Sequence, residues 1–84
     1  MEATLGIQEF VEYVVLKLIE HPEDASVIHE QRGDRHEFHI RLNQTDIGRV
    51  IGRNGHTIEA IRNLVRVAAD KAGLEVSVEV DEAE

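Results

Sequence analysis

The sequence predicts a single α+β domain in which three helices cover one face of a three-stranded mixed sheet. Apolar residues recur every three or four positions near both ends of the chain, as in amphipathic helices. In two shorter segments they alternate with polar residues, as in half-buried strands. The chain has 84 residues, enough for one sheet layer and one helix layer. We therefore expect one domain over residues 1–84, with an ordered core of about 5–80.

The first half of the chain predicts a helix and a hairpin. The helix spans about residues 6–20 and stops before Pro22, because the residue preceding a proline avoids the helical region. Its apolar face consists of Ile7, Phe10, Val11, Val14, Leu18 and Ile19. Residues 25–31 are predicted to form a short strand and residues 32–35 a turn around Gly33. Phe38, Ile40 and Leu42 then alternate with polar residues, which indicates a half-buried strand.

The second half predicts two helices and a last strand. A short helix of about residues 46–51, with Thr45 as its N-cap, runs into Gly52. A longer helix spans about 56–72 and ends at Gly73, which is placed for a left-handed C-cap. Its inward residues are expected to be Ile58, Ile61, Leu64, Val65, Ala68 and Ala72. Residues 74–80 form the last strand, and a right-handed crossover makes it parallel to the preceding one.

The formal net charge of −8 at pH 7 is unevenly distributed along the chain. Residues 41–66 contain five arginines and two acidic residues, a formal charge of +3, so the other residues carry −11. A local positive patch can still hold a phosphate, because the Debye length is about 8 Å at physiological salt. The acidic remainder would suppress indiscriminate binding of polyanions, or it simply keeps a small protein dispersed.

The most informative segment lies between the last two predicted helices, where Gly52 and Gly55 flank Arg53 and Asn54. Glycines lack Cβ, so they permit positive φ and let a sugar-phosphate chain approach the backbone closely. The segment leads into a helix N-terminus, where unpaired N–H groups and the helix dipole favour an anion. Arg53 can donate to a phosphate in a bidentate manner, and Asn54 through its amide. The pattern predicts a phosphate-binding turn; the alternative is that the glycines only make a tight turn.

Other cations lie near this turn in the sequence. Arg49, Arg62 and Arg66 either extend a phosphate track or are ordinary solvated helix charges, and Arg41 is placed near the bases. Protonated His56 adds a cation directly beside Gly55.

Apolar side chains at the same place offer a floor for bases. Ile47, Ile51 and Ile58 have the spacing for this role, although most of their area should lie in the core. Phe10, Tyr13 and Phe38, the only aromatic residues, are remote from the turn in sequence. Stacking of bases on aromatic rings is therefore not expected, and sequence preference should be weak.

The run Val50–Ile58, V-I-G-R-N-G-H-T-I, resembles the signature of the KH domain: an aliphatic pair, then G-x-x-G, then an isoleucine three positions on. The order helix–strand–strand–helix–helix–strand resembles the bacterial type II KH arrangement. Because this one module accounts for roughly residues 5–80, the chain resembles the small bacterial single-KH-domain proteins of the KhpA (YlqC) family. The segments His21–Asp24 and Asp46–Gly52 also resemble that group.

The resemblance implies a cytoplasmic RNA-binding protein, an RNA chaperone or post-transcriptional regulator, that clamps about four nucleotides of single-stranded RNA on the G-x-x-G loop. It assigns the loop to residues 52–55 and the apolar groove to Ile47, Val50, Ile51 and Ile58. It also implies self-association, or pairing with a larger KH-containing protein. The alternative function is a KH-fold interaction module that acts mainly through homo- or heterodimerisation.

Other classes of protein find no support in the sequence. The chain has no cysteine, and neither a G-K-[ST] nor a G-x-G-x-x-G motif is present, so we expect no enzyme and no cofactor. His36 and His39 should point to opposite faces of a strand. With His29 they are interpreted as solvent-facing strand residues, and no metal site is expected. The apolar runs are too short to span a membrane and the N-terminus is unlike a signal peptide.

Overall fold

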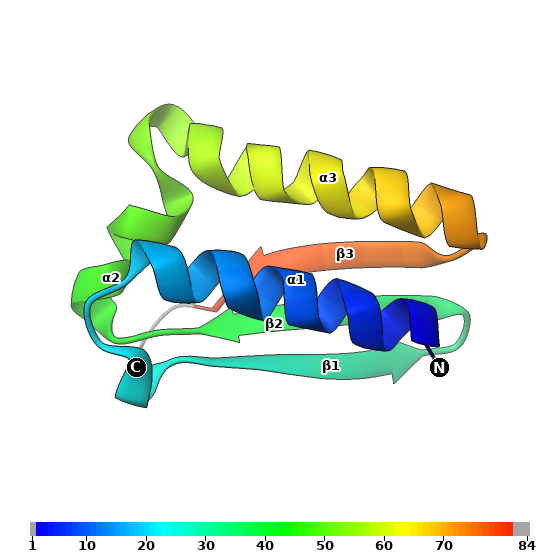
Figure 1. Cartoon of the computed structure of the whole chain (residues 1–84), viewed down its shortest axis with the longest axis horizontal. Helices are drawn as coiled ribbons and strands as arrows, with labels where there is room; N and C mark the ends of the chain where they lie inside the picture. Colours follow the sequence, from blue (N-terminus) through cyan, green and yellow to red (C-terminus); the bar gives the residue numbers. More distant parts are fainter. Residues whose placement is uncertain (1, 82–84) are drawn as a thin grey trace.

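The computed structural model describes residues 2–81 and has the predicted order of helices and strands (Figure 1). The elements are α1 (Glu2–Leu18), β1 (Ser26–Arg32), β2 (Arg35–Arg41), α2 (Gln44–Ile51), α3 (His56–Ala72) and β3 (Glu75–Val80), with short 3₁₀ turns at Pro22–Asp24 and Arg53–Gly55. The α+β class is therefore confirmed. The bounds of α3 agree with those expected from periodicity, and Gly73 ends it in the left-handed conformation with φ 73°.

The sheet is mixed, with the strand order β1-β2-β3. β1 and β2 pair antiparallel around a two-residue turn in which Gly33 has a φ of 61°. β2 and β3 pair parallel, with Phe38 opposite Val78. The helices lie on one side of this sheet, α1 against β1 and α3 against β3 (Figure 1). From α1, the Gln8 side-chain amide donates to the Val27 carbonyl of β1 at 3.1 Å.

The hydrophobic core lies between the sheet and the helices. Phe38 and Ile40 are fully buried at its centre, and α1 contributes Ile7, Val11 and Val15. From α3 the buried residues are Ile58, Ile61, Val65 and Ala69. The expectation that Leu64, Ala68 and Ala72 face inward is wrong: all three are exposed. Both stripes of apolar residues on α3 have helical spacing, and only the packing against β3 decides which one is buried.

Two further boundaries differ from those expected. α1 begins at Glu2 rather than near residue 6. The apolar pattern does not reveal this first turn, because the inward-facing residue three positions before Ile7 is the polar Thr4, which is buried. The N-cap of α2 is Asn43 and not Thr45. The Asn43 side-chain oxygen accepts from the Thr45 backbone N–H and from its hydroxyl, both at 2.9 Å.

The strand histidines also differ from the sequence-based interpretation. His36 is buried on the helix-covered face, where its Nδ1 lies 2.9 Å from Nε2 of the half-buried His29. The His29 ring stacks on Phe38 with ring centroids 4.7 Å apart. These two histidines are therefore not solvent-facing. His39 does lie on the opposite face, as the strand alternation predicts, but it is only partly exposed.

A buried carboxylate joins the end of α1 to α2. Asp46 is fully buried, and its two oxygens accept the backbone N–H groups of Glu20 and His21 at 3.1 and 2.9 Å. Arg49, one turn later on α2, lies 3.4 Å from one of the same oxygens. A buried charge is tolerated when it is paired and hydrogen-bonded in this way. Asp46 thus fixes the position from which α2 continues toward Gly52.

We expect Asp46→Asn to lower the free energy of unfolding by about 1–3 kcal/mol, because the amide nitrogen would face backbone donors that need an acceptor. Urea unfolding followed by circular dichroism measures the change. The control is Asp70→Asn on the exposed face of α3, which removes the same charge from a side chain without a partner among residues 2–81. Equal losses in the two variants would contradict the role given to Asp46.

We expect His29 to make the fold less stable in acid. Burial, together with the nearby His36, lowers the pKa of His29 from its ordinary value of 6.5. As the pH falls through the ordinary value, the unfolded chain takes up a proton that the folded chain does not, so stability is lost. The free energy of unfolding of the wild type should therefore fall more between about pH 7.5 and pH 5.5 than that of His29→Gln.

The comparison with His29→Gln is needed because His39 acts in the opposite direction. A hydrogen bond to Asp81 raises the pKa of His39 against the effect of burial, so its contribution is present at low pH and is lost as the pH rises through the raised pKa. Parallel stability curves for the wild type and His29→Gln would contradict the prediction.

Candidate nucleic-acid interface

The candidate site is the sharp connection between α2 and α3. Gly52 ends α2 with φ 80° and ψ 172°, and its N–H donates to the Gly48 carbonyl at 2.9 Å. Asn54 and Gly55 follow with φ of 56° and 75°, both in the left-handed region. The Gly55 N–H closes the turn by donating to the Gly52 carbonyl at 3.1 Å. The loop delivers the chain directly to the first turn of α3.

The two glycines are required for different reasons. A Cβ on Gly52 would collide with the Thr57 side chain, 2.6 Å from its Cβ, and would lie 2.9 Å from the Thr57 backbone nitrogen. At Gly55 only the positive φ disfavours a side chain, because a Cβ there would meet no atom within 4 Å. Gly52 therefore packs against α3, whereas the space beside Gly55 is open to an approaching molecule.

The tip of the loop presents polar side chains without partners. Arg53, Asn54 and His56 are exposed, and none of their side chains makes a hydrogen bond or ion pair with another residue of 2–81. They stand beside the start of α3. The His56 N–H donates to the Arg53 carbonyl, and the N–H groups of the next positions have no carbonyl one turn earlier in the helix. Arg53 is thus an exposed guanidinium next to a helix N-terminus, where an anion is favoured and could accept from both.

The other candidate arginines are engaged within the protein. Arg49 lies 3.2 Å from Glu20 as well as near Asp46, and the Arg41 Nε donates to Asp81 at 3.3 Å. Arg62 donates to Glu59 at 2.8 Å, and its Nε donates to the Val78 carbonyl at 2.9 Å. The formal charge of +3 for residues 41–66 therefore overstates the positive field that these side chains offer to a ligand.

The predicted apolar floor belongs mainly to the core. Ile58 is buried, and Ile47 and Ile51 are half-buried against the same cluster. Only the edges of Ile47 and Ile51 remain available beside the loop. Phe38 is fully buried, and the exposed Tyr13 lies on α1 with Lys17 over its ring.

Sequence reasoning missed a polar groove between α3 and the edge strand β3. It has a volume of about 350 Å³ and is lined by Arg35, Arg62, Val65, Arg66, Val76, Ser77, Val78 and Glu79. The Arg35 side chain has no partner among residues 2–81, and Arg66 donates only to the neutral Asn63. The position of α3 beside β3 was a signal for this groove. No sequence pattern indicated that Arg35, at the start of β2, would line it as well.

The element order, the parallel pairing of β2 with β3 and the G-x-x-G turn between α2 and α3 define a KH domain of the type II arrangement. The sequence profile described as "KhpA/KhpB, KH domain" matches residues 8–80. The chain therefore belongs to the KhpA/KhpB family of KH-domain proteins. KH domains are binding modules, so membership in this family places the chain outside the enzymes.

Similar proteins carry consistent names. The chain is 38% identical to "RNA-binding protein KhpA" of Leifsonia xyli subsp. xyli, covering 79% of this chain and 87% of the relative. It is 34% identical to the protein of the same name from Halalkalibacterium halodurans, covering 88% and 97%. The corresponding protein of Bacillus subtilis is 30% identical, covering 88% and 91%. Within residues 2–81, no helix has both the length and the apolar character needed to cross a membrane.

We expect Gly52→Ala and Gly55→Ala to differ in stability although both place alanine at a positive φ. Gly55→Ala should lower the free energy of unfolding by about 1–2 kcal/mol, the usual cost of a left-handed alanine. Gly52→Ala should lower it further, because Thr57 must also move. Thermal unfolding of the two variants beside the wild type measures both changes, and a larger loss for Gly55→Ala would refute the distinction.

Proposed function

We propose that this protein binds single-stranded RNA in the bacterial cytoplasm by clamping about four nucleotides on the Gly52–Gly55 loop, and that it acts as an RNA chaperone or post-transcriptional regulator. The observation that carries the proposal is the state of Arg53. This arginine has no partner within residues 2–81, whereas Arg41, Arg49 and Arg62 are each paired with carboxylates. The names of the relatives, "RNA-binding protein KhpA", support the same function.

In this proposal the sugar-phosphate chain passes over the open side of Gly55. Arg53 donates to one phosphate, while the Asn54 amide and the N–H groups at the start of α3 donate to its neighbour. Bases then lie against the edges of Ile47 and Ile51 and continue toward the groove between α3 and β3. Apolar contacts and backbone hydrogen bonds discriminate poorly between bases, so sequence preference is weak and a single domain binds with micromolar or weaker affinity.

The decisive variant converts the loop to Gly-Asp-Asp-Gly with Arg53→Asp and Asn54→Asp. Two carboxylates in place of the cation should weaken binding to a short single-stranded RNA by about tenfold or more, because the phosphate contact becomes repulsive. Fluorescence anisotropy with a labelled oligonucleotide measures the affinity, and circular dichroism verifies that the fold is retained.

The control for the loop variant is Lys17→Asp with Gln44→Asp, which changes the formal charge by the same amount at exposed positions on α1 and α2. If the two double variants lose the same affinity, binding depends on net charge alone. If the loop variant binds RNA as the wild type does, the proposed clamp is wrong.

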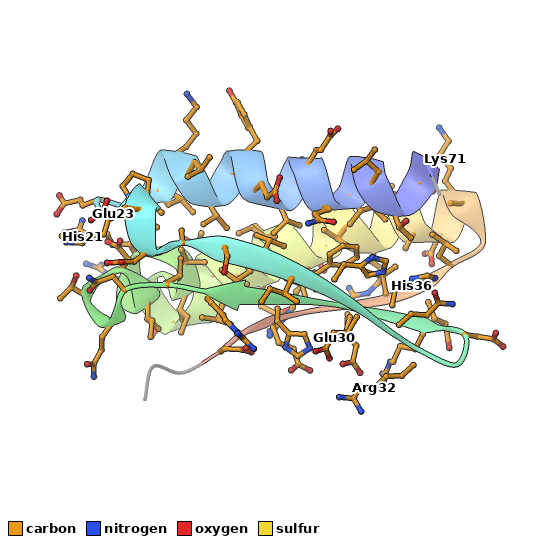
Figure 2. The ribbon with its side chains drawn as sticks, turned by 90° about the horizontal axis from the view of Figure 1, so that it is seen from below. His21, Glu23, Glu30, Arg32, His36 and Lys71 are labelled. Atoms are coloured by element: carbon orange, nitrogen blue, oxygen red, sulfur yellow. The ribbon has the colours of Figure 1, made fainter. Side chains whose placement is uncertain are left out.

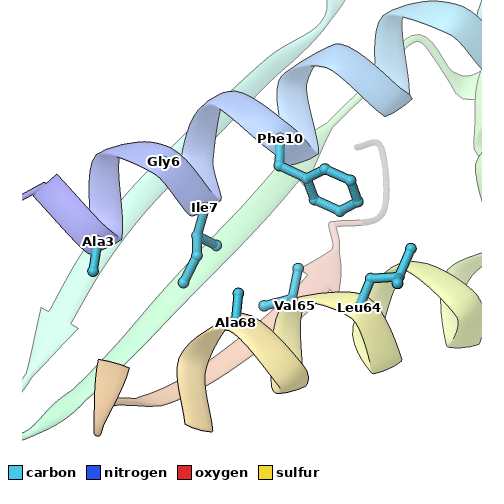
Figure 3. Close-up of a pocket in the computed structure, with 7 residues that line it drawn as sticks. All are labelled: Ala3, Gly6, Ile7, Phe10, Leu64, Val65 and Ala68. Carbon is cyan, nitrogen blue, oxygen red and sulfur yellow. The ribbon is translucent and has the colours of Figure 1, made fainter. Parts of the chain in front are cut away.

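A second function, dimerisation, is favoured by the apolar surface between α1 and α3. Leu64 and Val67 on α3 are 58% and 65% exposed. A groove of about 410 Å³ beside them is lined by Ala3, Gly6, Ile7, Phe10, Leu64, Val65 and Ala68 (Figure 3). We propose that this surface receives a second copy of the chain or a larger KH-containing protein, because exposed apolar side chains around a groove are typical of interfaces.

Leu64→Asp tests this second function, and its control is Leu16→Asp, a similarly exposed leucine of α1 that does not line this groove. Sedimentation velocity should show the wild type and the control as dimers and Leu64→Asp as a monomer. A monomeric wild type at all accessible concentrations would remove the homodimer. Measuring RNA affinity on the same variants separates the two functions, since the loop lies outside the groove.

A further inference from the structure

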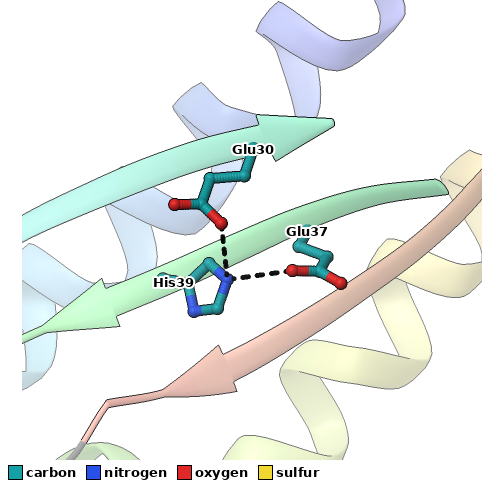
Figure 4. Close-up of side chains that lie close together, drawn as sticks. All are labelled: Glu30, Glu37 and His39. Atoms are coloured by element: carbon teal, nitrogen blue, oxygen red, sulfur yellow. Dashed lines mark hydrogen bonds and ion pairs between the residues drawn. The ribbon is translucent and has the colours of Figure 1, made fainter. Parts of the chain in front are cut away.

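The face of the sheet opposite the helices carries a cluster of ionisable side chains that the RNA-binding function does not use. Glu30 comes from β1, and Glu37 and His39 come from β2 (Figure 4). Figure 2 shows Glu30 and Arg32 projecting from the sheet on the side away from the helices. Asp81, directly after β3, completes the cluster through a contact with His39. Residues from three neighbouring chain segments thus meet at one place.

The distances within the cluster fit a single metal ion. The His39 Nε2 lies 3.2 Å from Glu37 Oε1 and 3.7 Å from Glu30 Oε1, and one ligand atom from each of the three residues lies within 4.8 Å of the others. Zn²⁺ binds nitrogen and oxygen ligands at about 2.0–2.2 Å in tetrahedral sites. Ligand atoms of such a site are separated by about 3.3–3.5 Å, so small side-chain movements would bring all three onto one ion.

Asp81 orients the histidine as a metal ligand requires. Its Oδ1 lies 3.0 Å from His39 Nδ1, which directs Nε2 toward the two glutamates. Metal-binding histidines commonly donate the N–H of their other ring nitrogen to a carboxylate, which fixes the ring and its tautomer. The Arg41 Nε holds the second oxygen of Asp81 at 3.3 Å. Asp81, which follows β3, therefore supports a set of ligands that comes from β1 and β2.

The Arg32 guanidinium already lies beside two of these residues, Glu30 and Glu37. Glu30 and Glu37 are direct partners across β1 and β2, and like charges in such positions repel each other. Arg32 relieves the repulsion, with its Nε 3.1 Å from Glu37 and its Nη2 3.5 Å from Glu30. The Arg32 side chain is 69% exposed, so it can swing into solvent and leave both carboxylates to an ion.

We propose that Glu30, Glu37 and His39 form a binding site for one divalent transition-metal ion of the Zn²⁺ class, with Asp81 as a positioning residue and water in the open coordination position. Imidazole and carboxylate together suit such an ion better than they suit Mg²⁺ or Ca²⁺. The ion joins β1 to β2 and so reinforces a small domain that has no disulfide. The site is on the sheet face away from the helices, and its occupancy does not depend on RNA.

The test is isothermal titration of the 84-residue chain, without a histidine tag, with ZnCl₂ at neutral pH. The wild type should bind one equivalent and show a raised Tm. His39→Gln should abolish binding, and Asp81→Asn should weaken it by about 10- to 100-fold. Arg32→Ala should strengthen it, because the arginine competes for the same carboxylates. His21→Asn is the control, since His21 also lies near a glutamate, at 3.5 Å, but elsewhere on the surface.

The proposal would be overturned if the wild type bound no Zn²⁺, or if His39→Gln left the binding intact. Glu30→Gln keeps the test valid if His39→Gln does not fold, because Glu30 is exposed and its loss should weaken binding by at least about tenfold. Unchanged affinity in Glu30→Gln would likewise reject the site. A weaker affinity in Arg32→Ala would also reject the site, because an ion on Glu30 and Glu37 must compete with this arginine.

Discussion

The candidate RNA-binding loop depends on one buried carboxylate. Asp46 lies in the first turn of α2 and accepts two backbone N–H groups from the segment that follows α1. α2 has only eight residues, and since isolated helices of this length are unstable, it depends on tertiary contacts, those of the buried Asp46 and Val50 among them. With its start fixed to α1 and its end closed by Gly52, α2 delivers the loop at a defined angle to α3. The loop is thus positioned by a contact at the other end of the helix that precedes it.

The positive field that this protein offers to a ligand depends on which arginines are paired with carboxylates and not on composition alone. Counting residues 41–66 gives a positive segment, yet Arg41, Arg49 and Arg62 are each held by a carboxylate. Among residues 2–81, the arginines without a carboxylate partner are Arg53 at the tip of the loop, and Arg35 and Arg66 in the groove between α3 and β3. If RNA binds as proposed, the acidic remainder of the chain should disfavour contacts of the strand elsewhere on the surface.

Periodicity and turn chemistry were sufficient to predict the class, the element order and the bounds of α3, because the apolar repeats and the capping glycines are local signals. They could not decide which of two apolar stripes on α3 is buried, since Leu64 and Val65 both have helical spacing. The interpretation of His36 as solvent-facing was wrong because a buried histidine can make its hydrogen bond with a second histidine, here His29, instead of with water. The Glu30–Glu37–His39 cluster was within reach of the sequence: a two-residue turn at Gly33 places residues 30 and 37 opposite each other.

On each edge strand of the sheet, one carbonyl is occupied by a side chain from the helix above it. Gln8 of α1 donates to the Val27 carbonyl of β1, and Arg62 of α3 donates to the Val78 carbonyl of β3. An open edge strand offers unpaired carbonyl and N–H groups to strands of other chains, which is a common route to aggregation. Arg62, one of the arginines predicted to contact a phosphate, thus takes up an edge carbonyl that a strand of another chain would need for pairing.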